Sequence, residues 1–177
     1  MAAVPDFSET DYGWVEPGSD VAGLDHPGPV PVRRVRSFRE KPGVDEARRC
    51  FERGDLWNTM IVATKVKVLW RLGRRLLPEI TGRFDHFRRS LNRMRASGKK
   101  SADRHLADLY QSIPDFDFSR AVLAPAAPHF AVMPLNDILW SDWGRPERVF
   151  ETLRKIGRRP SLLETARRWR LLHRPCR

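Results

Sequence analysis

The chain has 177 residues, enough for one domain with a single buried core. Hydrophobic residues make up 41% and charged residues 31%, which is typical of a folded globular protein, and no apolar stretch is long enough to predict a membrane-spanning helix. The formal net charge is +11, and because residues 1–31 hold six acids and no Lys or Arg, the remainder carries 11 + 6 = +17. We therefore expect anionic partners, and charge alone does not distinguish phosphate esters, nucleic acid and acidic lipid.

The start of the chain lacks the basic and apolar regions of a secretory signal, and Cys50 and Cys176 are too few for a disulfide framework. We therefore predict a cytoplasmic protein without membrane partners. The five histidines are scattered without metal-ligand spacing, so no zinc site is expected. Cys50 falls on the apolar face of a predicted helix, and neither cysteine is expected to be a nucleophile.

Taken in chain order, residues 1–31 are rich in Pro, Gly and acids and should be mostly loop, with a short strand at DYGWV. PVRRVRSF predicts a strand that ends before Pro42, and apolar spacing from Val44 predicts a helix closed by Gly54. The segment LWNTMIVATKVKVLWRL begins as a strand and becomes a basic helix that continues toward Arg95. We expect breaks in that helix at Pro78 and Gly82.

The second half continues the alternation of helices and strands. Ser101 should cap a helix that ends before Pro114, a half-buried strand should follow near Val132, and a helix should run from Pro146 to Gly157. Residues 158–177 carry seven arginines against one acid and predict a basic amphipathic tail, which leaves residues 1–157 as the domain. Strands that alternate with helices predict an α/β domain with a mostly parallel sheet and ligands just beyond strand ends.

The clearest candidate site is FREKP, where a carboxylate and an ammonium follow a predicted strand. Glu40 can accept hydrogen bonds from two sugar hydroxyls, and Lys41 offers a compact positive charge to a phosphate. An exposed ion-pairing turn is the structural alternative.

Three further motifs place polar groups near strand ends. Asn58 in LWNTMI can donate to and accept from sugar hydroxyls, and Gly13 in DYGW would let a ligand approach the backbone, although it could be only a turn or bulge. Asp142 in LWSDWGRPERV stands between a strand and a helix that starts with proline, where a carboxylate can hold Mg²⁺ against substrate phosphates or merely cap the helix.

The ordered set DYGW, FREKP, LWN and WSDWG resembles the nucleotide-sugar pyrophosphorylases, and is most similar to bacterial mannose-1-phosphate guanylyltransferases. The resemblance runs from about residue 4 to residue 157. It implies a Rossmann-like, glycosyltransferase-A-like nucleotidyltransferase fold with a mixed sheet.

The resemblance also implies the residue roles. The Gly13 amide would contact the sugar, Glu40 and Asn58 would bind its hydroxyls, Lys41 its phosphate, and Asp142 a Mg²⁺ ion. Lys41 and Asp142 are the expected catalytic residues. The implied reaction joins a sugar-1-phosphate, mannose-1-phosphate first, to a nucleoside triphosphate and releases pyrophosphate, so that GDP-mannose is the expected product.

The sequence departs from the family in several places. Relatives begin with a strand and a glycine-rich loop that binds the triphosphate, and this chain contains no G-x-G pair, so we expect the N-terminal nucleotide-binding part to be missing. The family places a second metal-binding carboxylate in that same N-terminal part, so we expect it to be missing as well. Met60 stands where many relatives have glycine, and Ser119 where many have aspartate. The isolated chain should therefore have little activity, and its exposed sheet edge should favour pairing with a complementing chain or a homo-oligomer.

Two other functions stay open on sequence grounds. The arginines of residues 158–177 could bind nucleic-acid phosphates, which would show a steep salt dependence. The chain could also be an inactive interaction module. An enzyme fragment that keeps the acceptor site is the leading hypothesis.

Overall fold

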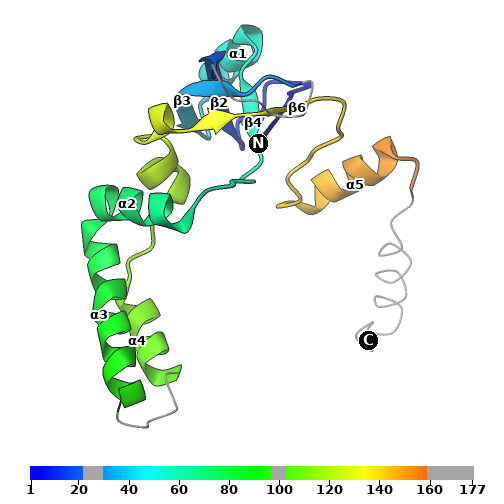
Figure 1. Cartoon of the computed structure of the whole chain (residues 1–177). Helices are drawn as coiled ribbons and strands as arrows, with labels where there is room; N and C mark the ends of the chain where they lie inside the picture. Colours follow the sequence, from blue (N-terminus) through cyan, green and yellow to red (C-terminus); the bar gives the residue numbers. More distant parts are fainter. Residues whose placement is uncertain (22–29, 97–102, 159–177) are drawn as a thin grey trace, which may run out of the picture. The chain divides into compact units, whose positions relative to one another are not determined.

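The computed structural model describes residues 1–21, 30–96 and 103–158, and it divides into two compact units, Met1–Asn136 and Asp137–Arg177 (Figure 1). The boundary between the units follows residue 136, whereas the domain predicted from the sequence extends to residue 157. The predicted basic tail lies outside the described residues from residue 159 onward.

The first unit is built on a six-stranded mixed sheet of order β5-β3-β2-β4-β1-β6. Its strands, in chain order, are β1 (Ala2–Ala3), β2 (Gly13–Asp20), β3 (Arg33–Glu40), β4 (Leu56–Asn58), β5 (Ala131–Val132) and β6 (Pro134–Leu135). Among the described strands only β1 and β6 pair in parallel, so the predicted mostly parallel sheet is wrong. The reason is β2, which lies antiparallel between β3 and β4 and separates the two parallel strands that helix α1 (Val44–Arg53) connects.

A register shift in β2 and β3 determines which side chains share a face of the sheet. Glu16 pairs with Ser37 and Pro17 with Val35, so one residue of β3 is left without a partner and forms a bulge. As a result Val35 returns to the face that also carries Phe38. With Val15, Leu56, Ala2, Ala127 and Val132, these two residues form the core of this face.

Helix α1 covers the opposite face, as Figure 1 shows. Arg39, which pairs with Trp14 on that face, forms an ion pair with Glu46 of α1 at 2.9 Å. The helix begins after Gly43 and ends at Gly54, whose φ of 81° is the left-handed cap that the sequence predicts. Buried Ala47 and Cys50 face the sheet, which confirms that Cys50 is packed.

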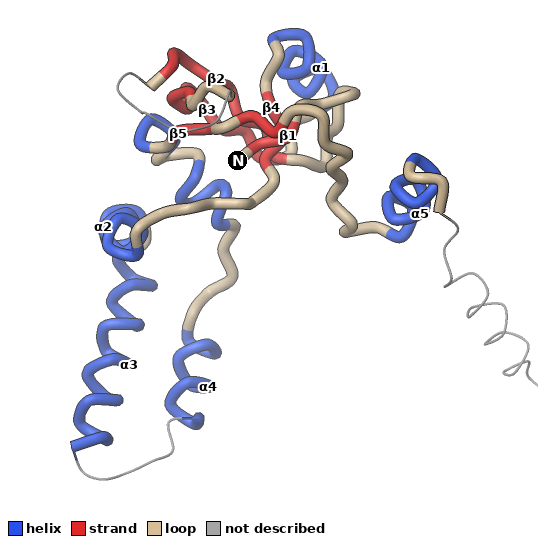
Figure 2. Tube along the Cα trace, turned by 45° about the vertical axis from the view of Figure 1, so that its right-hand side comes forward, coloured by secondary structure: helices blue, strands red, loops and turns tan. Residues whose placement is uncertain are grey.

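Helices follow β4 on the side of the sheet away from α1 (Figure 2). They are α2 (Val66–Leu76), α3 (Pro78–Ala96), α4 (Asp103–Ser112), a π-helical turn η1 (Ser119–Leu123) and a 3₁₀ turn η2 (Ala127–His129). Helices α3 and α4 lie side by side in both views. The predicted break at Pro78 is confirmed, whereas Gly82 lies inside the continuous α3, because glycine lowers helix propensity without blocking the helix.

The second unit contains helix α5 (Pro146–Lys155). Proline occupies its first position, and Gly157, with a φ of 66°, follows its last turn, as the sequence predicts. Over the described ranges, none of the helices combines the length and apolar character that crossing a bilayer requires.

Candidate functional site

Strand pairing brings three of the predicted site residues together on one face of the sheet. Gly13 pairs directly with Glu40 at the end of the β2–β3 ladder, and Asn58 ends β4 on the other side of β2. An ideal Cβ built on Gly13 would lie 2.7 Å from Glu40 Oε2 and 3.3 Å from Asn58 Cβ. We call Gly13, Glu40 and Asn58 the polar corner.

Gly13 is required here by close packing and not by an unusual backbone angle. Besides the Glu40 carboxylate, the edge of the Phe38 ring would stand 2.9 Å from a Cβ at this position. Contacts this short essentially never occur for a real Cβ, so a side chain would push into the corner. The glycine thus lets the Glu40 carboxylate lie directly over the β2 backbone.

Glu40 is half-buried, and its surroundings alter its acidity. Burial raises the pKa of the Glu40 carboxyl, and the negative charge of Asp117 acts in the same direction. The Ser119 hydroxyl and the positive charges of Lys41 and Arg120 act against the increase. The carboxylate therefore has a hydroxyl donor and two cations around it, and burial limits its contact with water.

Lys41 follows Glu40 in a left-handed turn, with a φ of 49°. The backbone N–H of Lys41 donates to the carbonyl of Tyr12 at 3.2 Å, which fixes the turn against the residue that precedes Gly13. The Lys41 side chain is exposed beside the polar corner. It therefore remains available to an anion from solvent.

Asn58 is held by the turn that follows β4. Its Oδ1 accepts a hydrogen bond from the backbone N–H of Met60 at 3.1 Å, and its Nδ2 lies 3.0 Å from Met60 Sδ. Met60 has a φ of 56°, and its sulfur also lies 3.7 Å from the hydroxyl oxygen of buried Ser119. The side chain of Met60 thus reaches across from Asn58 to the group beside Glu40.

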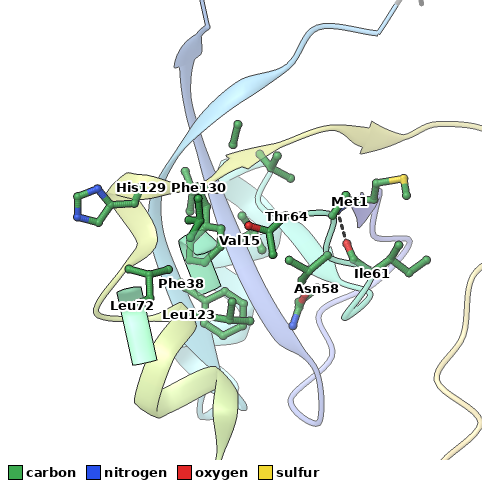
Figure 3. A pocket seen from close by; sticks show the side chains of 16 residues that line it. Met1, Val15, Phe38, Asn58, Ile61, Thr64, Leu72, Leu123, His129 and Phe130 are labelled. Atoms are coloured by element: carbon green, nitrogen blue, oxygen red, sulfur yellow. Dashed lines mark hydrogen bonds between the residues drawn. The ribbon is translucent and has the colours of Figure 1, made fainter. Parts of the chain in front are cut away.

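Next to the polar corner, the same face of the sheet opens into a largely apolar cavity of about 250 Å³ (Figure 3). Asn58 and Phe38 line it together with Val15, Leu123 and Phe130, whereas the imidazole of His129 points outward in the figure. The N-terminal ammonium of Met1 donates to the carbonyl of Ile61 at 2.8 Å and so ties down the rim. Asn58 contributes an amide side chain to the cavity lining, and the Glu40 carboxylate lies at the adjoining polar corner.

Asp142, the predicted metal ligand, belongs to the second unit. Its Oδ1 accepts the backbone N–H of Gly144 at 2.8 Å, and its Oδ2 lies 3.5 Å from Nη1 of Arg148. Asp142 does not cap α5, because the N-cap residue is Arg145 and has no side-chain cap hydrogen bond; the carboxylate instead holds the turn that precedes the helix. Within the part of the chain that is described, no group of three or more His, Cys, Asp or Glu could hold a metal.

The surroundings of the buried Cys50 thiol determine whether it could act as a nucleophile. Burial, followed by the neighbouring Asp55, raises the pKa of the Cys50 thiol to about 11. The thiol is therefore protonated at neutral pH, and its predicted lack of a nucleophilic role is consistent with the structure. Asp55 is itself fully buried and paired with Arg53, so it stabilises the connection from α1 to β4.

Residues in and just before η1 surround the Glu40 carboxylate, and the sequence alone does not predict that they lie there. In the sequence, Ser119 stands out only as a departure from the pattern of the family that the motifs resemble, and nothing singles out Asp117 or Arg120. Asp117 caps the turn by accepting the N–H of Arg120 at 3.0 Å, and Ala124 N–H bonds to Ser119 O in the π-helical pattern. Since π-helical turns recur at functional sites, the segment FSRAVL has a structural signal that propensity rules do not detect.

No protein-family model matches the chain, and a search of curated proteins finds no match. Among solved structures, it is similar to a crystal structure described as mannose-1-phosphate geranyltransferase from Thermus thermophilus, with a TM-score of 0.55 and 22% identity. The match covers 75% of this chain and 33% of that chain, so the chain spans about a third of that protein's length. At this identity the likeness shows the fold alone, and it confirms the predicted α/β fold with a mixed sheet.

Proposed function

We propose that the polar corner is the acceptor site of a sugar-1-phosphate nucleotidyltransferase and that its sugar is mannose-1-phosphate. The observation that carries the proposal is the convergence of Gly13, Glu40 and Asn58, which lie far apart in sequence, on one corner of the sheet. The fold shared with a transferase whose description names mannose-1-phosphate is consistent with this function.

Each residue has a distinct part in the proposed binding mode. Glu40, when ionised, accepts hydrogen bonds from two sugar hydroxyls, and Asn58 donates to and accepts from a third. The backbone at Gly13 contacts the sugar where a side chain would prevent its approach. Exposed Lys41 attracts the phosphate, and Arg120 adds a second positive charge close to Glu40.

In the proposed reaction, an oxygen of the sugar phosphate attacks the α-phosphorus of a nucleoside triphosphate. A new P–O bond forms as the bond to the departing pyrophosphate breaks, and positioning of the two anions provides most of the catalysis. The chain contains no G-x-G phosphate loop, so we propose that a complementing chain supplies the nucleotide site. A Mg²⁺ requirement through Asp142 and the phosphate oxygens, and guanine as the base, remain predictions.

The experiment that tests the acceptor site is calorimetric titration of the full chain with mannose-1-phosphate. We expect binding that falls by about tenfold in Glu40→Gln, because an uncharged amide loses part of the charge-assisted hydrogen bonding to hydroxyls. Glu52→Gln, an exposed carboxylate on α1 across the sheet, is the matched control and should bind normally. Mannose and inorganic phosphate, titrated separately, should each bind more weakly than the sugar phosphate.

The absence of any difference between the Glu40 and Glu52 variants would contradict the proposed site. Binding of inorganic phosphate as tight as that of the sugar phosphate would show general anion attraction by a protein of charge +11 instead. The nucleic-acid alternative depends on residues 158–177, nearly all of which lie outside the described residues, and no observation favours it.

A further inference from the structure

Met60 has an unusual backbone conformation directly after the strand that ends in the polar corner. Its φ of 56° is left-handed, a conformation that costs a residue with a Cβ roughly 1 kcal/mol or more. The turn is held from both sides: Met60 N–H bonds to Asn58 Oδ1, and the Thr59 hydroxyl donates to Met1 O at 2.8 Å. The backbone conformation of Met60 is therefore imposed by the fold.

The thioether occupies the space between two polar groups of the candidate site. Asn58 Nδ2 lies 3.0 Å from the sulfur and Ser119 Oγ lies 3.7 Å from it. Ser119 is buried and acts on the Glu40 carboxylate, so the sulfur bridges the groups on which the proposed sugar binding depends. A thioether is a weak acceptor, and a sugar hydroxyl would be a stronger partner, because it can accept from the Asn58 amide and donate to the Ser119 oxygen.

We propose that Met60 occludes the sugar site and that a sugar hydroxyl must displace its thioether to reach Asn58 and Ser119. The inference rests on the proposed function and adds a residue that sets affinity for the sugar phosphate. Displacement is feasible because Met60 is 52% exposed and its unbranched side chain can rotate outward without repacking the core. Met60 thus competes with substrate for the Asn58 amide and for the space beside Ser119.

The opposite role for Met60 makes the proposal testable. If the thioether formed an apolar wall against the bound sugar, its removal would weaken binding. Under occlusion, removal strengthens binding, because the Asn58 amide and the Ser119 hydroxyl are then open to the hydroxyl. The sign of the change in affinity therefore separates the two roles.

The test compares mannose-1-phosphate binding to the full wild-type chain, Met60→Gly and Met60→Ala. Glycine removes the side chain and the left-handed strain, and alanine removes the side chain alone. We expect the dissociation constant to fall about fivefold in both variants, which corresponds to one weak hydrogen bond released. Ile61→Ala, in which a neighbouring side chain of similar exposure on the cavity rim is shortened, is the matched control and should not tighten binding.

A second measurement works on the wild-type chain and does not depend on a variant that folds. With methionine methyl groups labelled by ¹³C, mannose-1-phosphate should shift the Met60 signal toward that of a mobile, exposed side chain, and Glu40→Gln should need about tenfold more ligand for the same shift. Unchanged or weaker binding by both Met60 variants would overturn the occlusion while wild-type binding upholds the acceptor site. No binding by any of the proteins, and no methyl shift, would reject both proposals.

Discussion

Replacement of Gly13 by alanine tests the geometry of the polar corner most directly. The new Cβ would meet Phe38 Cζ at 2.9 Å, and ordinary contact begins at 3.4 Å, so the ring edge must retreat by 3.4 − 2.9 = 0.5 Å. The Glu40 carboxylate, 2.7 Å away, is the end of a flexible side chain and can swing aside, which moves it off the β2 backbone. The substitution should therefore reduce the affinity for mannose-1-phosphate more than it reduces the stability of the fold.

The expected size of each effect follows from these contacts. Overpacking costs roughly 1–3 kcal/mol, and loss of glycine's freedom in the unfolded chain returns about 0.5–1 kcal/mol, so a net destabilisation of about 1 kcal/mol is expected. Displacement of the Glu40 carboxylate should weaken mannose-1-phosphate binding by about tenfold, since a charged hydrogen-bond partner leaves its position.

Urea denaturation and calorimetric titration measure these two quantities on the same protein. Gly82→Ala is the control, because nothing lies within 4 Å of a Cβ at that position inside α3, and it should stabilise the protein by about 1 kcal/mol without changing binding. If Gly13→Ala bound mannose-1-phosphate as tightly as the wild type, the claim that the carboxylate over Gly13 holds the sugar would be refuted.

Three further predictions concern charged groups. Burial raises the folded-state pKa of Glu40, so stability should fall as the pH rises from the ordinary carboxyl pKa through the raised one, and Glu40→Gln should remove this slope in urea denaturation at several pH values. For Glu16, the hydrogen bond from Ser37 lowers the pKa, so Glu16→Gln should cost about 1–3 kcal/mol at neutral pH in thermal denaturation, and the deficit should shrink as the pH falls through that lowered pKa. Asp142→Asn should change stability by less than about 1 kcal/mol, because an amide oxygen can still accept the Gly144 N–H, yet it should reduce Mg²⁺-dependent pyrophosphate release by a preparation complemented with a nucleotide site.

Local signals were sufficient for the parts of the fold that depend on single positions. Gly54 and Gly157 end helices α1 and α5 because a left-handed residue is needed there, and Pro78 and Pro146 begin helices because their missing N–H costs nothing at that position. The direction of the strands could not be read in the same way. It depends on the antiparallel insertion of β2 between the strands that α1 connects, which is a long-range contact.

In the candidate site, too, some features are indicated by the sequence and others depend on long-range contacts. The family resemblance assigns Gly13 and Glu40 to one sugar site, and the antiparallel pairing of β2 with β3, which the sequence did not predict, places the two residues within contact. The approach of Ser119 could not be anticipated, because η1 reaches the corner through a π-helical turn with no propensity signature. Asp142 illustrates a different limit: its residue type suits a metal or a turn equally, and the contacts to Gly144 and Arg148 are those of a turn.

The distribution of left-handed residues links the stability of the corner to its proposed chemistry. In the described ranges, non-glycine residues with positive φ are Lys41, Met60 and Asp137, and the first two flank the polar corner. Such conformations persist only where the surroundings hold them, here through Tyr12 O for Lys41 and Asn58 Oδ1 for Met60. Since the Asn58 side chain both fixes the strained turn and serves as a proposed sugar ligand, displacement of Met60 by a hydroxyl would alter the contacts that maintain the strain. Ligand binding and the conformation of this turn should therefore be coupled, and the Met60 methyl signal is where that coupling should be measured.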